Sequence, residues 1–120
     1  MNVLIADDDR VFTRMTAAQL KAKGCRVELA ADAMQAVMFA MRSPPDVIVL
    51  DIHMPGGTGF SVLTKLRQST RTQQIPIVVV SATTSPEDEQ KARDLGAAEF
   101  LHKPMDRDSL HAALLRVSGA

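Results

Sequence analysis

The sequence is poor in cysteine and has no long hydrophobic run. Cysteine occurs once, as Cys25, which excludes an internal disulfide and a zinc site built from cysteines. No apolar stretch approaches the roughly 20 residues that a membrane-spanning helix needs. The residues after Met1 enter an apolar run directly, without the charged segment of a secretory signal. We therefore expect a cytoplasmic protein that does not associate with membranes.

Charge of one sign is not in excess either. Lysine and arginine total 14, and aspartate and glutamate also total 14. Domains that bind nucleic acid usually carry a basic stripe or patch, so we expect no direct contact with nucleic acid. A length of 120 residues fits one domain of ordinary size with its own core. Because the sequence contains no linker, repeat or low-complexity segment, we expect a single domain over residues 1–120.

Five segments predict strands, and each is too short for a helix. Four of them, at residues 2–6, 47–50, 77–80 and 98–102, contain an apolar run, and the fifth covers residues 26–30. Runs of this kind are typical of strands that are buried on both faces of a parallel sheet. Four of the five stop at polar residues, which are Asp7-Asp8-Asp9, Asp51, Ser81 and Lys103. Because the carboxyl ends of parallel strands lie along one edge of a sheet, we expect these side chains to share a site.

Segments with helical periodicity separate the runs. Asp32, Ser85 and Asp106 are predicted N-caps of the second, fourth and fifth helices. The third helix is predicted over residues 60–67, after a loop that begins at Met54. Five strands that alternate with five helices predict an α/β fold, a doubly wound (βα)5 parallel sheet with helices on both faces.

The shared site contains three carboxylates, a hydroxyl and an ammonium group. Neighbouring carboxylates disfavour each other's ionised forms, and a divalent cation between them removes this cost. Mg²⁺ prefers oxygen ligands, so Asp8 and Asp51 are predicted ligands with Asp7 assisting, and Mn²⁺ is an alternative ion. Lys103 and Ser81 would contact the remaining oxygens of a phosphoryl group, whose transfer depends mostly on positioning and electrostatics.

In this pattern the chain resembles the receiver domain of bacterial two-component response regulators over nearly its whole length. The resemblance rests on four motifs: Asp7-Asp8, Asp51 within Val-Leu-Asp-Ile-His-Met-Pro, Ser81-Ala82, and Lys103-Pro104. It implies a flavodoxin-like fold with strand order 2-1-3-4-5, as in chemotaxis regulators. It also implies that Asp51 accepts a phosphoryl group from a phosphohistidine of a sensor histidine kinase or a phosphotransfer protein.

The resemblance implies further roles. The implied Mg²⁺ ligands are Asp7, Asp8, Asp51 and the backbone carbonyl of His53. Lys103 and Ser81 would assist the transfer, so the domain is no conventional enzyme but catalyses its own phosphorylation and dephosphorylation. Ser81 and Phe100 would act as switch residues, and the Lys103-Pro104 bond would be cis. The switched surface, formed by the fourth helix, the fifth strand and the fifth helix, would control a downstream protein effector.

Two positions depart from the usual family pattern. Ser81 stands where threonine is common, which keeps the hydroxyl and loses a methyl group. Thr58 stands where aspartate is common, and threonine also caps helices, so the third helix is expected to form. His53 lies where family members differ and where side chains control the access of water to the acyl phosphate.

Other interpretations fit less of the sequence. A phosphatase of the haloacid dehalogenase type would use Asp7-x-Asp9-x-Val11 with Ser81 and Lys103, but it would leave Asp51 without a role, and its acidic fourth motif and cap insertion are absent. A turnover assay with a phosphomonoester would separate the two. Asp9 is instead predicted to cap the first helix. A receiver that is never phosphorylated is disfavoured by the complete acidic set, and Gly56-Gly57-Thr58-Gly59 lacks the Gly-Lys-Ser/Thr ending of a phosphate-binding loop.

Overall fold

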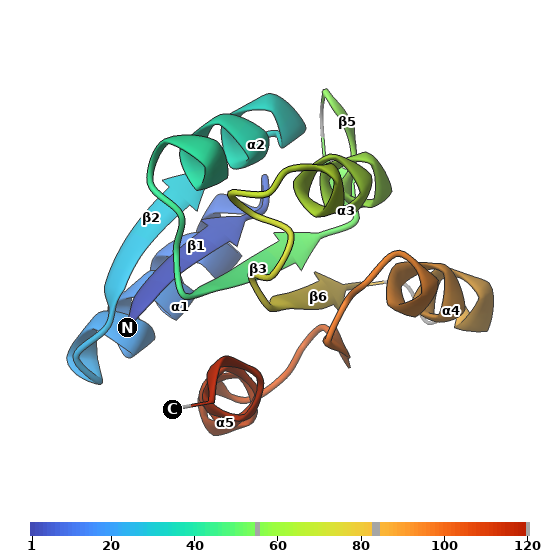
Figure 1. Cartoon of the computed structure of the whole chain (residues 1–120). Coiled ribbons are helices and arrows are strands. Elements are labelled where there is room, and N and C mark those ends of the chain that lie inside the picture. Colours follow the sequence, from blue (N-terminus) through green and yellow to red (C-terminus); the bar gives the residue numbers. More distant parts are fainter. Residues whose placement is uncertain (55, 83–84, 120) are drawn as a thin grey trace.

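A computed structural model describes residues 1–54, 56–82 and 85–119, and it places a five-stranded parallel sheet between two layers of helices (Figure 1). The strands of this sheet are β1 (Asn2–Ala6), β2 (Arg26–Ala30), β3 (Val47–Asp51), β6 (Ile77–Ser81) and β7 (Glu99–His102). They are ordered β2-β1-β3-β6-β7, and every neighbouring pair is parallel. The predicted order 2-1-3-4-5 and the flavodoxin-like fold are therefore confirmed.

The helices are α1 (Arg10–Ala22), α2 (Ala33–Arg42), α3 (Gly59–Gln68), α4 (Pro86–Asp94) and α5 (Arg107–Ser118). Helices α2, α3 and α4 pack on one face of the sheet, and α1 and α5 pack on the other. Each helix begins after a side chain that accepts a backbone N–H of its first turn. These N-caps are Asp9, Asp32, Thr58, Ser85 and Asp106, all as predicted. None of the helices in the described ranges combines the length and hydropathy that crossing a membrane requires.

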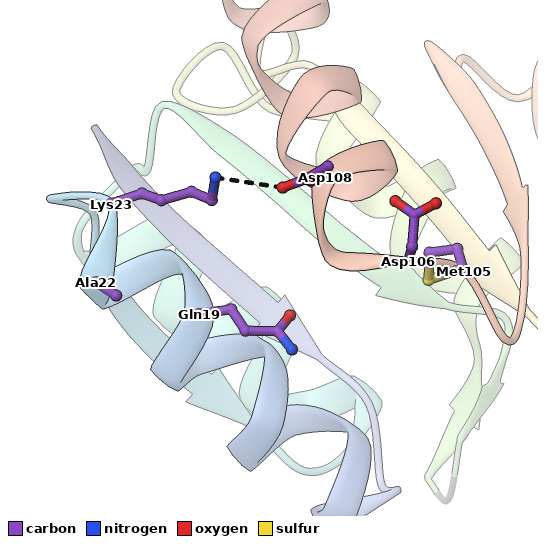
Figure 2. A pocket seen from close by; sticks show the side chains of 6 residues that line it. All are labelled: Gln19, Ala22, Lys23, Met105, Asp106 and Asp108. Carbon is purple, nitrogen blue, oxygen red and sulfur yellow. Dashed lines mark hydrogen bonds and ion pairs between the residues drawn. The ribbon is translucent and has the colours of Figure 1, made fainter.

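A groove of about 740 Å³ runs between α1 and the start of α5 (Figure 2). Its lining residues are Gln19, Ala22, Lys23, Met105, Asp106 and Asp108. Lys23 Nζ lies 3.5 Å from an Asp108 carboxylate oxygen and links the two helices across the groove. Both residues are exposed, so this ion pair contributes little to stability.

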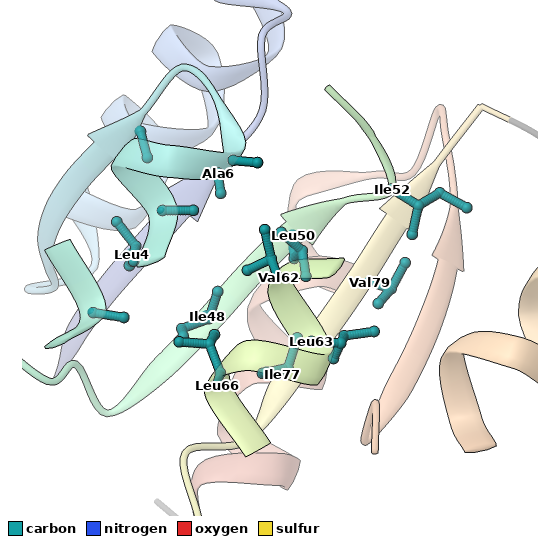
Figure 3. Close-up of a cluster of buried hydrophobic side chains, with 14 of the residues drawn as sticks. Leu4, Ala6, Ile48, Leu50, Ile52, Val62, Leu63, Leu66, Ile77 and Val79 are labelled. Carbon is teal, nitrogen blue, oxygen red and sulfur yellow. The ribbon is translucent and has the colours of Figure 1, made fainter. Parts of the chain in front are cut away.

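The core forms two apolar clusters, one on each face of the sheet. Leu4 and Ile48 point toward α2 and α3 (Figure 3), whereas Val3 and Val49 point toward α1 and α5. Successive side chains of a strand point to opposite faces, so a strand covered on both sides must be apolar at every position. This is why the apolar runs of β1, β3 and β6 are continuous, whereas the edge strands β2 and β7 include charged residues.

A small second sheet was not predicted. The loop predicted from Met54 onward instead contributes to two short antiparallel strands, β4 (His53–Met54) and β5 (Gly57–Thr58). Strands of two residues are too short to show alternation in a sequence. Pro55 of this segment lies outside the described residues. Gly56 has a φ of +80°, a conformation that glycine adopts without strain.

Candidate functional site

Three carboxylates meet at the carboxyl edge of the sheet. Asp7 and Asp8 directly follow β1, and Asp51 is the last residue of β3, the strand that pairs with β1. One carboxylate oxygen from each of the three lies within 4.8 Å of the others. Asp7 and Asp51 are buried, whereas Asp8 is exposed. The structure therefore brings together the three acidic residues that the sequence predicts for one site.

Lys103 places its ammonium group beside two of these carboxylates. Its Nζ lies 2.6 Å from Asp7 Oδ2 and 3.9 Å from Asp51 Oδ2. The Lys103 backbone N–H donates to the carbonyl of Ser81 at 2.8 Å, which fixes the start of this loop against the end of β6. The peptide bond between Lys103 and Pro104 is cis, as the resemblance implied. One ammonium among three carboxylates leaves an excess of negative charge at the site.

The carboxyl group of Asp51 is harder to ionise in this site than in water. Burial raises the pKa of Asp51 from its ordinary value of 3.8 to about 6, and the negative charge of Asp7 adds to the rise. The backbone N–H of His53 donates to Asp51 Oδ1 at 3.2 Å and acts in the opposite direction, as does the Lys103 ammonium. The arrangement therefore favours a cation between Asp7 and Asp51.

Asp9 lies outside the carboxylate cluster. Its Oδ1 accepts the backbone N–H of Phe12 at 3.0 Å and caps α1. Its own N–H donates to Asp7 Oδ1 at 2.9 Å, so its backbone helps to orient Asp7. Because the Asp9 carboxylate caps the helix, the structure gives no support to Asp7 and Asp9 as a pair of catalytic residues.

Ser81 and Phe100 lie on neighbouring strands. Ser81 ends β6 and is fully buried, and Phe100 of β7 is 7% exposed. In the register of the two strands, Ser81 pairs with His102, so Phe100 lies two residues before that point. The Phe100 ring belongs to the apolar cluster beneath α2, α3 and α4, away from the carboxylates. The side chain of His53 is exposed, with Nε2 3.9 Å from an Asp88 oxygen on α4.

Two contributors to the site were missed in the sequence. A Cβ atom on Gly59 would lie 2.5 Å from the Asp51 carbonyl oxygen, so only glycine lets α3 begin this close to β3. The ring of Phe12 lies under Lys103, with its centroid 4.4 Å from Nζ. Gly59 is part of a glycine-rich loop in the sequence, and its place directly after a helix cap is a signal that could identify it. Phe12 gave no signal, because its contact depends on how α1 and β7 are placed.

Only some of the cavities lie at the carboxylate cluster. The 740 Å³ groove between α1 and α5 includes none of the three carboxylates. A smaller cavity of about 230 Å³ opens beside Asp7 and Asp8 and is also lined by Arg10 and Arg14 of α1. The two arginines therefore place positive charge in the cavity that the acidic residues line.

Comparison with known proteins shows which family the chain resembles. The family model described as the response regulator receiver domain matches residues 3–115. The response regulator PleD of Caulobacter vibrioides is 37% identical over 110 residues, which are 92% of this chain and 24% of PleD. The chemotaxis protein CheY4 of Vibrio cholerae superposes with a TM-score of 0.91 at 34% identity over 97% of both chains.

A third similar protein carries a metal ion. The receiver domain of the sensor histidine kinase PA1611 of Pseudomonas aeruginosa has a TM-score of 0.91 at 30% identity, over 99% of this chain and 98% of that domain. Its structure has a magnesium ion coordinated in the active site cleft. The chain spans about a quarter to about half of the length of curated relatives that it matches.

Proposed function

The chain belongs to the response regulator receiver domain family, and we propose that it accepts a phosphoryl group on Asp51 and signals through a change of its surface. The observation that carries the proposal is the cluster itself. The carboxylates of Asp7, Asp8 and Asp51 lie within 4.8 Å of one another, with the Lys103 ammonium beside them. A haloacid dehalogenase-like phosphatase has no comparable support.

The donor set fits Mg²⁺. Three carboxylates at one sheet edge offer the oxygen ligands that Mg²⁺ prefers, and an exposed Asp8 leaves room for water and phosphoryl oxygens. We propose Asp7, Asp8, Asp51 and the backbone carbonyl of His53 as the residues that hold the ion, with Mn²⁺ as an alternative. When bound, the ion would balance negative charge on a phosphoryl group.

The protein's own groups would perform the transfer. A carboxylate oxygen of Asp51 would attack phosphorus, the bond from phosphorus to the donor's nitrogen or oxygen would break, and an acyl phosphate would form. Lys103, 3.9 Å from Asp51, would pair with a phosphoryl oxygen, and the Ser81 hydroxyl would contact another. The donor would be a phosphohistidine of a sensor histidine kinase or a phosphotransfer protein. A cytoplasmic location is part of the proposal, because kinase domains draw on ATP there.

Phosphorylation would change the surface formed by α4, β7 and α5. Ser81 and Phe100 lie on the paired strands β6 and β7 between Asp51 and this surface. A phosphoryl group that favours one arrangement of these residues would shift an existing equilibrium of the surface. We propose a downstream protein effector as the partner of this surface.

Phosphorylation by a small donor tests the proposal. Acetyl phosphate with Mg²⁺ should add one phosphoryl group to the wild-type protein, seen by intact-mass measurement, and should add none when Mg²⁺ is chelated. Asp51→Asn should abolish the addition, and Asp94→Asn, which changes an exposed carboxylate on α4, should leave it intact. Equal phosphorylation of wild type and Asp51→Asn would contradict the proposal.

A further inference from the structure

We propose that Phe12 is a positioning residue for Lys103. The ring of Phe12 holds the Lys103 ammonium group in place while a phosphoryl group is transferred to Asp51. The inference rests on the proposed function. Lys103 Nζ has three neighbours on different elements: Asp7 Oδ2 at 2.6 Å, Asp51 Oδ2 at 3.9 Å and the Phe12 ring centroid at 4.4 Å. An ammonium at this distance from a ring face is attracted by the ring's quadrupole.

The ring is held firmly enough to position another group. Phe12 lies in the first turn of α1, where its backbone N–H donates to the capping carboxylate of Asp9. Its half-buried side chain packs on the apolar cluster that includes Val3 and Leu110. The helix cap thus fixes the backbone of Phe12, and packing against the core fixes its ring. The ammonium group of Lys103, in contrast, lies at the end of a long flexible side chain and needs partners to define its position.

The nature of the partner matters for the reaction. A carboxylate in the place of Phe12 would compete with the phosphoryl group for the ammonium. A neutral ring attracts the ammonium without neutralising it, so its charge stays available. The Lys103 ammonium lies closer to Asp7 than to Asp51. The transfer requires it to contact Asp51 and the oxygens of the phosphoryl group that Asp51 accepts. A ring that covers the ammonium limits its movement to the space between the two carboxylates.

Substitution of the ring tests this role. Phe12→Leu keeps apolar volume and removes the ring, and we expect the rate of Asp51 phosphorylation by acetyl phosphate to fall about fivefold. Phe12→Tyr keeps the ring and should retain a rate near that of the wild type. Met15→Leu, at an exposed position one turn further along α1, is the matched control and should leave the rate unchanged.

A spectroscopic readout reports the contact independently of the reaction. In metal-free wild-type protein, the ε-methylene protons of Lys103 should show an upfield ring-current shift by NMR. The shift should persist in Phe12→Tyr and disappear in Phe12→Leu. Thermal melts establish that each variant is folded, and Phe12→Met is the second ring-free variant should Phe12→Leu fail to fold.

The outcomes separate the two proposals. Wild-type phosphorylation at Asp51 with an unchanged rate in a folded ring-free variant would overturn the role of Phe12 and leave the proposed function standing. Absence of the ring-current shift in the wild type would do the same. Absence of wild-type phosphorylation would overturn the proposed function, and the role of Phe12 with it.

Discussion

Helices α3 and α4 lie next to each other on the same face of the sheet, yet they are attached in different ways (Figure 1). Helix α3 buries Gly59, Val62, Leu63 and Leu66 completely or nearly so. Of the nine residues of α4, only Ala92 is buried. Helix α3 is therefore part of the core, whereas α4 contributes little apolar area to it.

The remaining attachments of α4 are mostly polar. Lys91 Nζ lies 4.5 Å from the Phe60 ring centroid, and the imidazole Nε2 of His102 lies 3.5 Å from Glu89. At the end of the helix, Arg67 of α3 donates to the Gly96 carbonyl at 2.8 Å. Elements with few apolar contacts open at lower free energy than core elements. The comparison therefore indicates that α4 can change position at modest cost while α3 stays fixed, as the output surface proposed above would require.

The largest expected effect is at the core of α3. Leu66→Ala removes a fully buried side chain, and its free energy of unfolding should fall by about 3 kcal/mol, because transfer and cavity costs add. Leu95→Ala at the end of α4 removes a partly buried leucine and should cost about 1 kcal/mol. Urea denaturation of both variants measures the difference. Similar losses in the two variants would remove the distinction between the helices.

The next effect concerns the link between the two helices. Besides Gly96, the guanidinium of Arg67 donates to the carbonyls of Gln73 and Ile75, each at 2.8 Å. Arg67→Met keeps the aliphatic stem and leaves these carbonyls without that donor, at a cost of about 2 kcal/mol. Amide exchange should accelerate at Ala97, which follows the tethered Gly96. Lys65→Met, at an exposed position of α3, is the control, and equal acceleration in both variants would count against the link.

The contacts of Arg67 also show which parts of the molecule can be predicted from the sequence and which cannot. The five strands of the parallel sheet, the five N-caps and the cluster of Asp7, Asp8 and Asp51 follow from local patterns and from one rule about where parallel strands end. Arg67 escaped notice because its acceptors are 6, 8 and 29 residues away along the chain. Phe12 escaped for the same reason, since its contact with Lys103 forms only after α1 and β7 are packed.

Neutralising Asp51, the last residue of β3, should raise the free energy of unfolding. The folded-state pKa of about 6 lies above the ordinary 3.8, so the folded protein binds a proton more tightly and loses stability as pH rises between these values. Asp51→Asn removes this loss. At pH 7 without metal it should raise the free energy of unfolding by about 1 to 2 kcal/mol, with solvent at the open site limiting the gain.

The same variant should give almost no gain near pH 4, where folded wild-type Asp51 already carries its proton. Melts at pH 4 and pH 7 in a chelating buffer measure both differences. Amide exchange within α4 should not change, because Asp51 adds no apolar contact to that helix. A gain at pH 4 as large as at pH 7 would show that ionisation of Asp51 is not the cause.

The smallest expected effect is at the outer contact between the two helices. Lys91→Met removes the ammonium above the Phe60 ring and should cost about 0.5 kcal/mol, the value of a cation–π contact near the surface. Lys91→Arg keeps a cation over the ring and should cost less. Because α4 has so few other attachments, even this small loss should speed amide exchange along α4 while exchange in α3 stays at the wild-type rate. Faster exchange in both helices would mean that they open as one unit, which would break the comparison between them.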